Sequence, residues 1–439
     1  MENKFRFKLS KLSKIMIAII VLAFCIRLIY IIRTPYMEKQ HDIEPNGNGL
    51  SYIFTIYNTG RLPDNNGGQN YHPPLHQILA AGWLKIISIF SQDYEIKCES
   101  LQFLTLIYSM LLILVLYKII EKFRLKDKYK ILLMIIFSFH PMFIILSGTL
   151  NNDILCLLLV SWSILRLIDW YYNPDIKNTI FLAIAIGLSV MAKTSGAIIA
   201  LPTIYIFLLR MIKDIKKTSQ KRMMFEKYVY LFIFFGCISL PIGLWYPIRN
   251  YLKFNQPILY IMDVNNADLY VGNNSLISRL TLFSSEIFKI YCDPWVDFNI
   301  PTFLAKCSLF EEYSWGTNFG IIYSISIVLN IIMILVFLIS FINCLVKKEK
   351  RNIEWKIAFT ILLIFNIISY LVMNIKLPYG CSMNFRYLLP TIFIGAMFTY
   401  FNLDYYRRKN IKLEKKMYKV LFMCTVILFM ASDIIILFS

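Results

Sequence analysis

Residues 14–44 read KIMIAIIVLAFCIRLIYIIRTPYMEKQHDIE, an apolar run that ends in a histidine and two carboxylates. The apolar part is as long as the ~18 residues that indicate a membrane helix. It is too long for the core of a signal peptide and no small-residue cleavage site follows it, so we expect it to remain as the first membrane span. Polar groups beside a span are costly unless they serve a purpose. We therefore interpret the polar segment at residues 34–98 as one half of an active site.

The composition is that of a membrane protein. Of the 439 residues, 58% are hydrophobic and only 17% are charged, which is unusual for a soluble protein. The net charge of +19 comes from Lys and Arg in short loops between apolar runs, as in membrane proteins with basic cytoplasmic loops. A nucleic-acid binder would gather these residues on one domain with interleaved aromatics. We therefore expect membrane lipids around the chain and no nucleic acid as a partner.

About eleven apolar runs have the length of a membrane span. They centre on residues 15–33, 100–120, 131–149, 151–168, 178–192, 195–211, 228–247, 320–346, 356–374, 386–402 and 418–437. The sequence predicts an all-α, polytopic membrane protein in which residues 1–439 form a single transmembrane domain.

Loop charge predicts the orientation. If the N-terminus is cytoplasmic, eleven crossings put six basic segments on one side: 1–14, 118–130, 166–177, 210–227, 347–356 and 407–419. These segments hold about thirty of the 46 Lys and Arg, as the positive-inside rule requires. The other side receives 34–98, 147–153, 192–196, 249–318 and 375–386, which carry most of the unusual polar residues. We expect a multi-pass protein of the cell membrane with its active site facing outside.

Two of these outer segments are long. Within 34–98, residues 50–57 and 75–90 read as short amphipathic helices in the membrane interface, too short and too polar to span it. The second segment, 249–318, contains several aromatic and acidic residues. It is predicted to be a folded cap.

Asp42 is the candidate for acid–base chemistry. A carboxylate at the membrane surface could act as a general base that takes a proton from an attacking hydroxyl or amine. The alternative is an interfacial Asp that caps the next helix or pairs with a nearby Lys. Glu44 could support Asp42, bind a metal or be solvated.

A second motif of the first loop is YHPPLH, at residues 71–76. Each proline restrains the residue before it, so we expect an extended turn and then a helix that starts at the proline pair. His72 and His76 share a helical face only if the helix includes both. With Asp42 and Glu44 they have the residue types of a metal site. A divalent metal is therefore an alternative to a metal-free site.

One carboxylate and three cations stand out in the other outer segments. Asp153, in the turn SGTLNND at 147–153, either caps a helix or forms a second polar wall of the same cavity. Lys193, Arg249 and Arg386 lie on the side that the topology depletes of positive charge. Binding a phosphate at the membrane surface explains them, and anchors that snorkel to the interface are the alternative.

The ordered set of motifs resembles bacterial GT-C glycosyltransferases, namely the aminoarabinose transferase-like enzymes and the protein O-mannosyltransferase-like family (glycosyltransferase family 39/83-type). The resemblance extends from about residue 15 to residue 400. The similar motifs are His41-Asp42, Gly60-Arg61-Leu62-Pro63-Asp64, Tyr71-His72-Pro73-Pro74-Leu75-His76, Asn151-Asn152-Asp153, Lys193-Thr194, Arg249-Asn250 and Arg386-Tyr387.

The resemblance implies a GT-C fold and an inverting transferase that uses a polyprenyl-phosphate sugar. Asp42 would correspond to the family's catalytic Asp, and Lys193 and Arg386 would stabilise the lipid-phosphate leaving group. The mannosyltransferases carry adjacent Asp-Glu where this chain has Asp42-Ile43-Glu44, which leaves the role of Glu44 open. The residues expected to bind substrate are Glu44, Tyr71, His72, Asp153, Lys193, Arg249, Arg386 and Tyr387.

Two other functions fit a membrane protein that handles lipid-linked sugars. A transporter or flippase would show ionisable residues within its spans and repeated halves with broken helices, whereas the polar residues here concentrate in the outer segments. An envelope polysaccharide polymerase or ligase is the second alternative. The acceptor could be a protein, a lipid or a wall polymer, and the sequence does not specify the sugar.

Overall fold

The described part of the chain is helical. The computed structural model describes residues 10–40, 49–258, 260, 269–281, 285–289, 298–347 and 349–438, and in these residues the regular elements are helices without a β-strand. The α-helices are α1 (Lys11–Arg33), α2 (Gly49–Thr59), α3 (Leu75–Ile87), α4 (Tyr94–Lys122), α5 (Asp127–Phe139), α6 (Pro141–Ile145), α7 (Asp153–Tyr172), α8 (Ile176–Ala192), α9 (Ala200–Lys217), α10 (Lys221–Phe254), α11 (Leu276–Leu280), α12 (Ile300–Phe310), α13 (Gly320–Val346), α14 (Ile353–Lys376), α15 (Pro390–Arg408) and α16 (Leu413–Phe438). The 3-10 helices are η1 (Gly68–Tyr71), η2 (Thr194–Ile199), η4 (Ser285–Phe288), η6 (Thr317–Phe319), η7 (Gly380–Met383) and η8 (Phe385–Leu388).

All eleven predicted runs are helical, and eight helices within the described residues are long and apolar enough to cross a membrane. The other three runs differ for clear reasons. α8 has only 17 residues, and the run at 131–149 is interrupted between α5 and α6. The second half of α15 carries Asn402, Asp404 and Arg407. The expected fold class, an all-α polytopic membrane protein, is confirmed.

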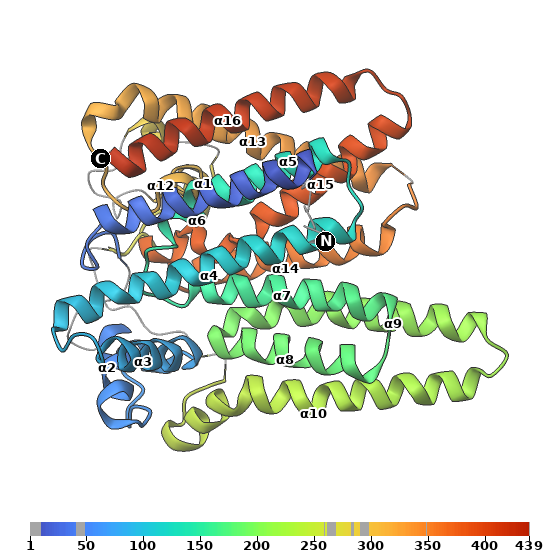
Figure 1. Ribbon diagram of the computed structural model, residues 1–439, viewed down its shortest axis with the longest axis horizontal. Coiled ribbons are helices and arrows are strands. Elements are labelled where there is room, and N and C mark those ends of the chain that lie inside the picture. Colours follow the sequence, from blue (N-terminus) through green and yellow to red (C-terminus); the bar gives the residue numbers. More distant parts are fainter. Residues whose placement is uncertain are drawn as a thin grey trace, which may run out of the picture.

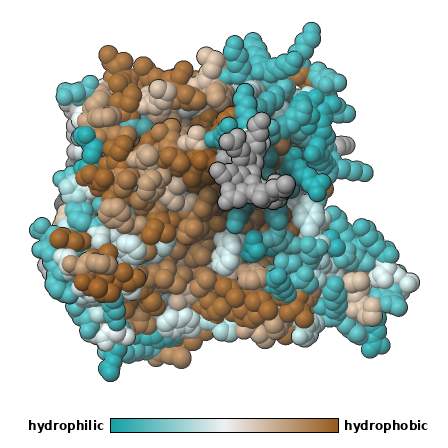
Figure 2. Space-filling view, viewed as in Figure 1, coloured by the Kyte–Doolittle hydropathy of each residue, from teal (hydrophilic) through white to brown (hydrophobic). Residues whose placement is uncertain are grey.

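The helices run back and forth between two ends of the bundle (Figure 1). The first loop, with α2 and α3, lies at the left end, as do the end of α8 and the start of α7. The connections from α9 to α10 and from α15 to α16 lie at the right end. Figure 2 shows a hydrophobic belt across the middle and hydrophilic surfaces at both ends. The loops are therefore divided between two ends, as the charge pattern predicts.

The first loop contains the two short helices expected from the sequence, α2 and α3. His72 has an extended backbone with φ −69° and ψ 142°, and α3 begins at Leu75, directly after Pro74. The predicted extended turn and helix start are therefore present. His76 lies in α3 while His72 precedes it, so the two histidines do not share a helical face.

A break between α5 and α6 is supported by a buried arginine. Pro141 has no N–H to donate, so the break leaves carbonyls of α5 without a helical partner. The Arg27 side chain of α1 supplies one: its Nη1 donates to the Ser138 carbonyl at 2.7 Å. Its Nε donates to Ser109 Oγ in α4 at 2.8 Å. This single side chain connects α1, α4 and α5.

α8 and α10 pack closely because small residues lie between them. A Cβ added at Gly187 would lie 2.7 Å from Ile242 Cβ, and one added at Gly243 would lie 3.2 Å from Val190 Cβ. Small residues at the interface of membrane helices let the backbones approach. This packing positions the end of α8, where Lys193 follows.

His76 joins α3 to the turn before α7. Its ring is buried, its Nε2 lies 3.2 Å from the Leu150 carbonyl oxygen, and it meets the Tyr108 ring edge-to-face at 6.1 Å. Burial lowers the pKa of His76 to about 4. The imidazole is therefore neutral at pH 7, and Nε2 can donate its proton to the carbonyl.

Gly187→Val should destabilise the protein, because a valine side chain cannot fit against Ile242 without separating α8 from α10. Overpacking of this kind costs about 1–3 kcal/mol, which should appear as a lower unfolding temperature of the detergent-solubilised protein. Gly236→Val is the matched control, since a Cβ added there would meet only Leu240 Cδ1, at 3.9 Å. Equal unfolding temperatures for the two variants would contradict the close packing.

The neutral state of His76 predicts a loss of stability in acid. Between the ordinary pKa of 6.5 and the folded-state value of about 4, the unfolded chain binds a proton that the folded chain does not. The free energy of unfolding therefore falls as pH falls through this window, by about 3 kcal/mol in total at ~1.4 kcal/mol per pH unit.

Unfolding in detergent between about pH 7.5 and pH 4 measures this effect. His76→Gln should make the pH dependence shallower, because it removes the titrating group. Gln77→Leu, which replaces a buried and non-titrating neighbour, should keep the wild-type dependence. If the His76→Gln curve runs parallel to the wild-type curve, the buried neutral histidine is not the cause.

Candidate functional site

Two of the predicted site residues, Asp42 and Glu44, lie outside the described residues. The chain that leads to them is described as far as Gln40. The Gln40 Nε2 donates to the Gly148 carbonyl at 2.8 Å, and its Oε1 accepts from the Leu150 N–H at 2.8 Å. Gln40 is therefore bound to the turn before α7 by both ends of its amide.

That turn, residues 147–152, positions Asp153. The Asn152 Nδ2 donates to the Ala192 carbonyl at 2.8 Å, which connects the start of α7 to the end of α8. α7 then begins with Asp153, whose side chain is 5% exposed. The start of α7 lies at the end of the bundle that carries the first loop (Figure 1), and Asp153 is its first residue.

Lys193 follows α8 in a tight turn. Its N–H donates to the Ser189 carbonyl at 3.2 Å, and its carbonyl accepts from the Gly196 N–H at 2.8 Å. A Cβ at Gly196 would lie 2.3 Å from the Ser189 carbonyl oxygen, so the turn requires glycine there. The ammonium group of Lys193 forms a salt bridge with Asp153 Oδ1.

Arg386 and Tyr387, from η8, complete this group. Arg386 Nη1 lies 3.9 Å from Asp153 Oδ2, and its Nη2 donates to the Tyr387 hydroxyl at 3.2 Å. The Lys193 ammonium and the Arg386 guanidinium lie 5.1 Å and 5.2 Å from the centre of the Tyr387 ring. Four of the predicted site residues therefore come together; we call them the Asp153 cluster: Asp153, Lys193, Arg386 and Tyr387.

The Asp153 cluster contains two cations and one carboxylate. Burial alone would lower the pKa of Lys193, but the neighbouring Asp153 and Tyr387 raise it above its ordinary value, so the ammonium group stays charged. The Arg386 guanidinium is charged at any physiological pH. The group therefore has a net positive charge in a largely buried place, which suits an anion such as phosphate.

Glu311, at the end of α12, was not recognised from the sequence as part of this arrangement. Its Oε2 accepts from Asn384 Nδ2 at 2.6 Å, and Asn384 Oδ1 accepts from the Arg386 N–H at 2.8 Å. Glu311 has φ 54° and ψ −161°, a backbone region that is essentially restricted to glycine and costs about 1–3 kcal/mol. The signal in the sequence is the carboxylate pair Glu311-Glu312 directly after an apolar helix.

Tyr71, His72 and Arg249 lie in contacts of the first loop. The Tyr71 ring lies 4.0 Å from the His72 ring, centre to centre, and meets Tyr260 edge-to-face at 5.5 Å. Arg249, near the end of α10, donates through Nη2 to the Pro63 carbonyl at 2.9 Å. The described contacts of Arg249 thus attach the first loop to α10.

Within the described ranges, no three His, Cys, Asp or Glu side chains converge as a metal site would require. Of the residues that suggested a metal, Asp42 and Glu44 lie outside these ranges. The divalent metal stays an alternative from the sequence.

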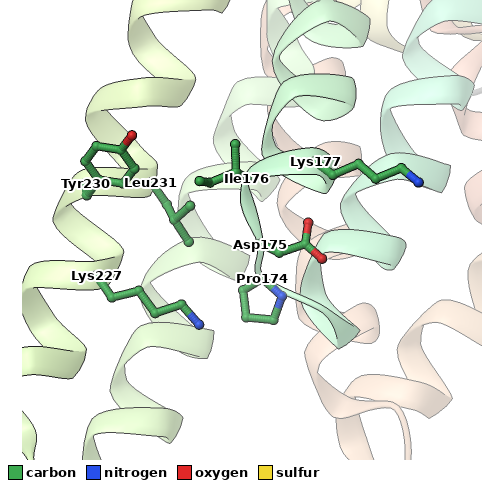
Figure 3. A pocket seen from close by; sticks show the side chains of 7 residues that line it. All are labelled: Pro174, Asp175, Ile176, Lys177, Lys227, Tyr230 and Leu231. Atoms are coloured by element: carbon green, nitrogen blue, oxygen red, sulfur yellow. The ribbon is translucent and has the colours of Figure 1, made fainter.

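A separate cavity of about 440 Å³ lies between the start of α8 and α10 (Figure 3). Pro174, Lys227 and Tyr230 are among its lining residues, and Figure 3 shows Lys227 reaching toward Pro174 while Lys177 points away. The start of α8 lies at the opposite end of the bundle from its last residue (Figure 1). This cavity is therefore not part of the Asp153 cluster.

Comparison with known proteins finds a similar family and a similar fold. Residues 71–245 match the family described as dolichyl-phosphate-mannose-protein mannosyltransferase, a range that includes Asp153 and Lys193. No curated protein matches the sequence significantly.

Three solved structures are similar to this chain to different degrees. The oligosaccharyltransferase of Archaeoglobus fulgidus tethered with an acceptor peptide aligns with a TM-score of 0.52 and 12% identity, over 95% of this chain and 55% of that one. The oligosaccharyltransferase AglB of Archaeoglobus fulgidus in complex with an inhibitory peptide and a dolichol-phosphate aligns with a TM-score of 0.51 and 13% identity, over 97% and 56%. ArnT of Cupriavidus metallidurans in the apo state aligns with a TM-score of 0.42 and 11% identity, over 96% and 78%.

The chain spans only a little over half the length of the two oligosaccharyltransferase structures, and at this level of identity the similarity establishes a shared fold. The family match lies within the region that shares this fold. The span-length helices described above are those of a protein that crosses the membrane many times. The chain therefore has the GT-C fold of a multi-pass membrane protein, and its residues 71–245 are similar to the mannosyltransferase family.

Proposed function

We propose that the protein transfers a sugar from a polyprenyl-phosphate donor to an acceptor, with inversion at the anomeric carbon. The observation that carries the proposal is the Asp153 cluster, in which two largely buried cations, Lys193 and Arg386, converge beside one carboxylate. A lipid-linked phosphate that leaves from a sugar needs such preorganised positive charge.

In the proposed reaction Asp42 is the general base. It takes the proton from the acceptor hydroxyl or amine, whose oxygen or nitrogen then bonds to the anomeric carbon. The bond from that carbon to the phosphate oxygen breaks, and the polyprenyl phosphate leaves with the electron pair. Lys193 and Arg386 stabilise the charge that develops on the leaving oxygen, while Asp153 and Tyr387 hold the two cations in place.

The position of Gln40 supports this role for Asp42. Gln40 is bound to Gly148 and Leu150 in the turn that leads to Asp153. Asp42 follows Gln40 by two residues, which span at most ~7 Å of chain. The described chain thus leads toward Asp42 from the turn that precedes Asp153.

The donor class has two supports. The family that matches residues 71–245 is described by a dolichyl-phosphate sugar donor, and one structure of similar fold is a complex with a dolichol-phosphate. We infer a polyprenyl-phosphate sugar for this chain as well.

The Asp153 cluster is proposed to face outside, because the basic loops lie at the other end of the bundle and basic loops stay in the cytoplasm.

Asp42→Asn should reduce sugar transfer by about 10²–10⁴-fold, the range for loss of a general base. Membranes that contain wild type or variant, supplied with labelled polyprenyl-phosphate sugars, measure transfer to endogenous acceptor. Asp64→Asn is the matched control, since this first-loop carboxylate is exposed and pairs with Lys253 at 2.5 Å. Undiminished transfer by Asp42→Asn would rule out the base assignment, and donor translocation without transfer would favour a transporter.

Lys193→Met and Arg386→Met should each lower kcat by about 10²–10³-fold, because each removes a group that stabilises the developing charge. The purified protein and a short-chain polyprenyl-phosphate donor provide kcat and KM separately. Lys356→Met is the control for loss of a buried cation. Lys356, in α14, is 5% exposed and pairs at 3.2 Å with Glu349, which precedes this helix. An equal loss of kcat in Lys356→Met, or a change in KM alone for Lys193→Met and Arg386→Met, would contradict the leaving-group role.

A further inference from the structure

A second concave site lies between α2 and the start of α4. Its volume is about 630 Å³, and it lies at the same end of the bundle as the first loop (Figure 1). None of the residues that we assign to the transfer reaction lines it. We call it the α2–α4 groove.

One wall of the α2–α4 groove is polar. Ser51, Thr55 and Asn58 line it, and their spacing of four and three residues puts them on one face of α2. Tyr52 and Ile53, on another face of this helix, are buried against the protein. The Asn58 side chain is exposed, so its amide can both donate and accept hydrogen bonds in the groove.

Aromatic rings line the groove beside these polar groups. The Tyr94 ring, 48% exposed, stacks on Phe54 with 4.9 Å between ring centres and 25° between planes. Tyr57 and Phe54 form a T-shaped pair with 6.0 Å between ring centres. Aromatic faces carry a negative quadrupole, which attracts the slightly positive C–H groups on the face of a sugar ring.

The charge of the groove favours a neutral ligand. Nine of its ten lining residues are uncharged, and Lys97 is the exception. The Lys97 ammonium donates to Gln92 Oε1 at 3.1 Å and lies 5.2 Å from the centre of the Tyr57 ring. Lys97 is therefore the one charged group in a lining that otherwise offers neutral hydroxyls, amides and rings.

We propose that the α2–α4 groove binds a saccharide, namely a neutral sugar unit of the acceptor. The exposed aromatic rings pack against a face of the sugar ring, and the neighbouring amides and hydroxyls bond its hydroxyl groups. The assignment to the acceptor rests on the proposed transfer reaction, whereas the binding of a sugar does not. The sugar unit can belong to a free glycan chain or to the headgroup of a glycolipid, since both present the same hydroxyl groups.

Saturation-transfer NMR on the full chain in detergent tests this inference with two neutral probes, maltotetraose and chitotetraose. Wild type should transfer saturation to the sugar protons of at least one probe. Tyr94→Ala and Asn58→Ala should each weaken binding about tenfold, which corresponds to about 1.4 kcal/mol. Tyr94→Phe, which keeps the ring, should bind more tightly than Tyr94→Ala. Tyr172→Ala is the matched control, because Tyr172 is a similarly exposed tyrosine, 53% exposed, at the far end of α7.

Absence of binding to both probes, or equal weakening by Tyr172→Ala, would overturn the proposal. Binding of phosphoglycerol that the neutral sugars do not displace would assign the groove to a phospholipid headgroup. That result would also overturn the proposal. Vesicles that carry a neutral glycolipid separate the two sources: tighter binding to these vesicles than to the free probes indicates a glycolipid acceptor, and equal binding indicates a free glycan chain. The transfer reaction is tested independently, since Asp42→Asn should keep full saccharide binding whether or not it abolishes transfer.

Discussion

The arrangement of the helices depends on the hydrogen bonds that the buried Arg27 guanidinium donates to neighbouring helices. In the hydrocarbon of a membrane no water is present to satisfy a free carbonyl, so each unpaired group costs several kcal/mol. The break before Pro141 creates such groups, and Arg27 bonds the Ser138 carbonyl from a neighbouring helix. The broken helix is therefore stabilised by α1, which lies beside it and supplies the partner for the Ser138 carbonyl.

The break that Arg27 supports also determines where the candidate site lies. Because α6 ends only a few residues later, the chain turns at 147–152 and begins α7 with Asp153. This turn packs closely on α1, since a Cβ at Gly148 would lie 2.9 Å from the Tyr30 ring. The segment that follows α1 then bonds the same turn through Gln40. α1 thus contributes both the support for the broken helix and the path of the chain toward Asp42.

Much of the fold could be predicted from the sequence because membrane spans are local properties. Apolar runs and basic loops sum over neighbouring residues, so they indicated the helices and the two ends of the bundle without any knowledge of contacts. The grouping of Asp153 with Lys193 and Arg386 followed from their common side, since few cations belong there. Long-range partners were not predictable in this way: the contact of Arg249 with Pro63 and that of Arg27 with Ser138 join segments far apart in the sequence. Arg27 in particular reads as one cation in an apolar run until its partners are known.

Glu311 helps to position Arg386 through a chain of hydrogen bonds. A residue with this backbone conformation persists only where surrounding contacts outweigh the strain, and the carboxylate of Glu311 accepts hydrogen bonds from Asn384 and from the Glu312 N–H. Charge-assisted bonds of this kind contribute about 1.5–3 kcal/mol each, which is enough to offset the strain. Asn384 uses the other end of its amide to bond the Arg386 N–H, so the backbone of Arg386 is fixed by α12 as well as by its own segment. The guanidinium itself donates to the Tyr387 hydroxyl and lies 3.9 Å from Asp153. Backbone and side chain are thus both positioned before a phosphate arrives, and that preorganisation is what a leaving-group site requires.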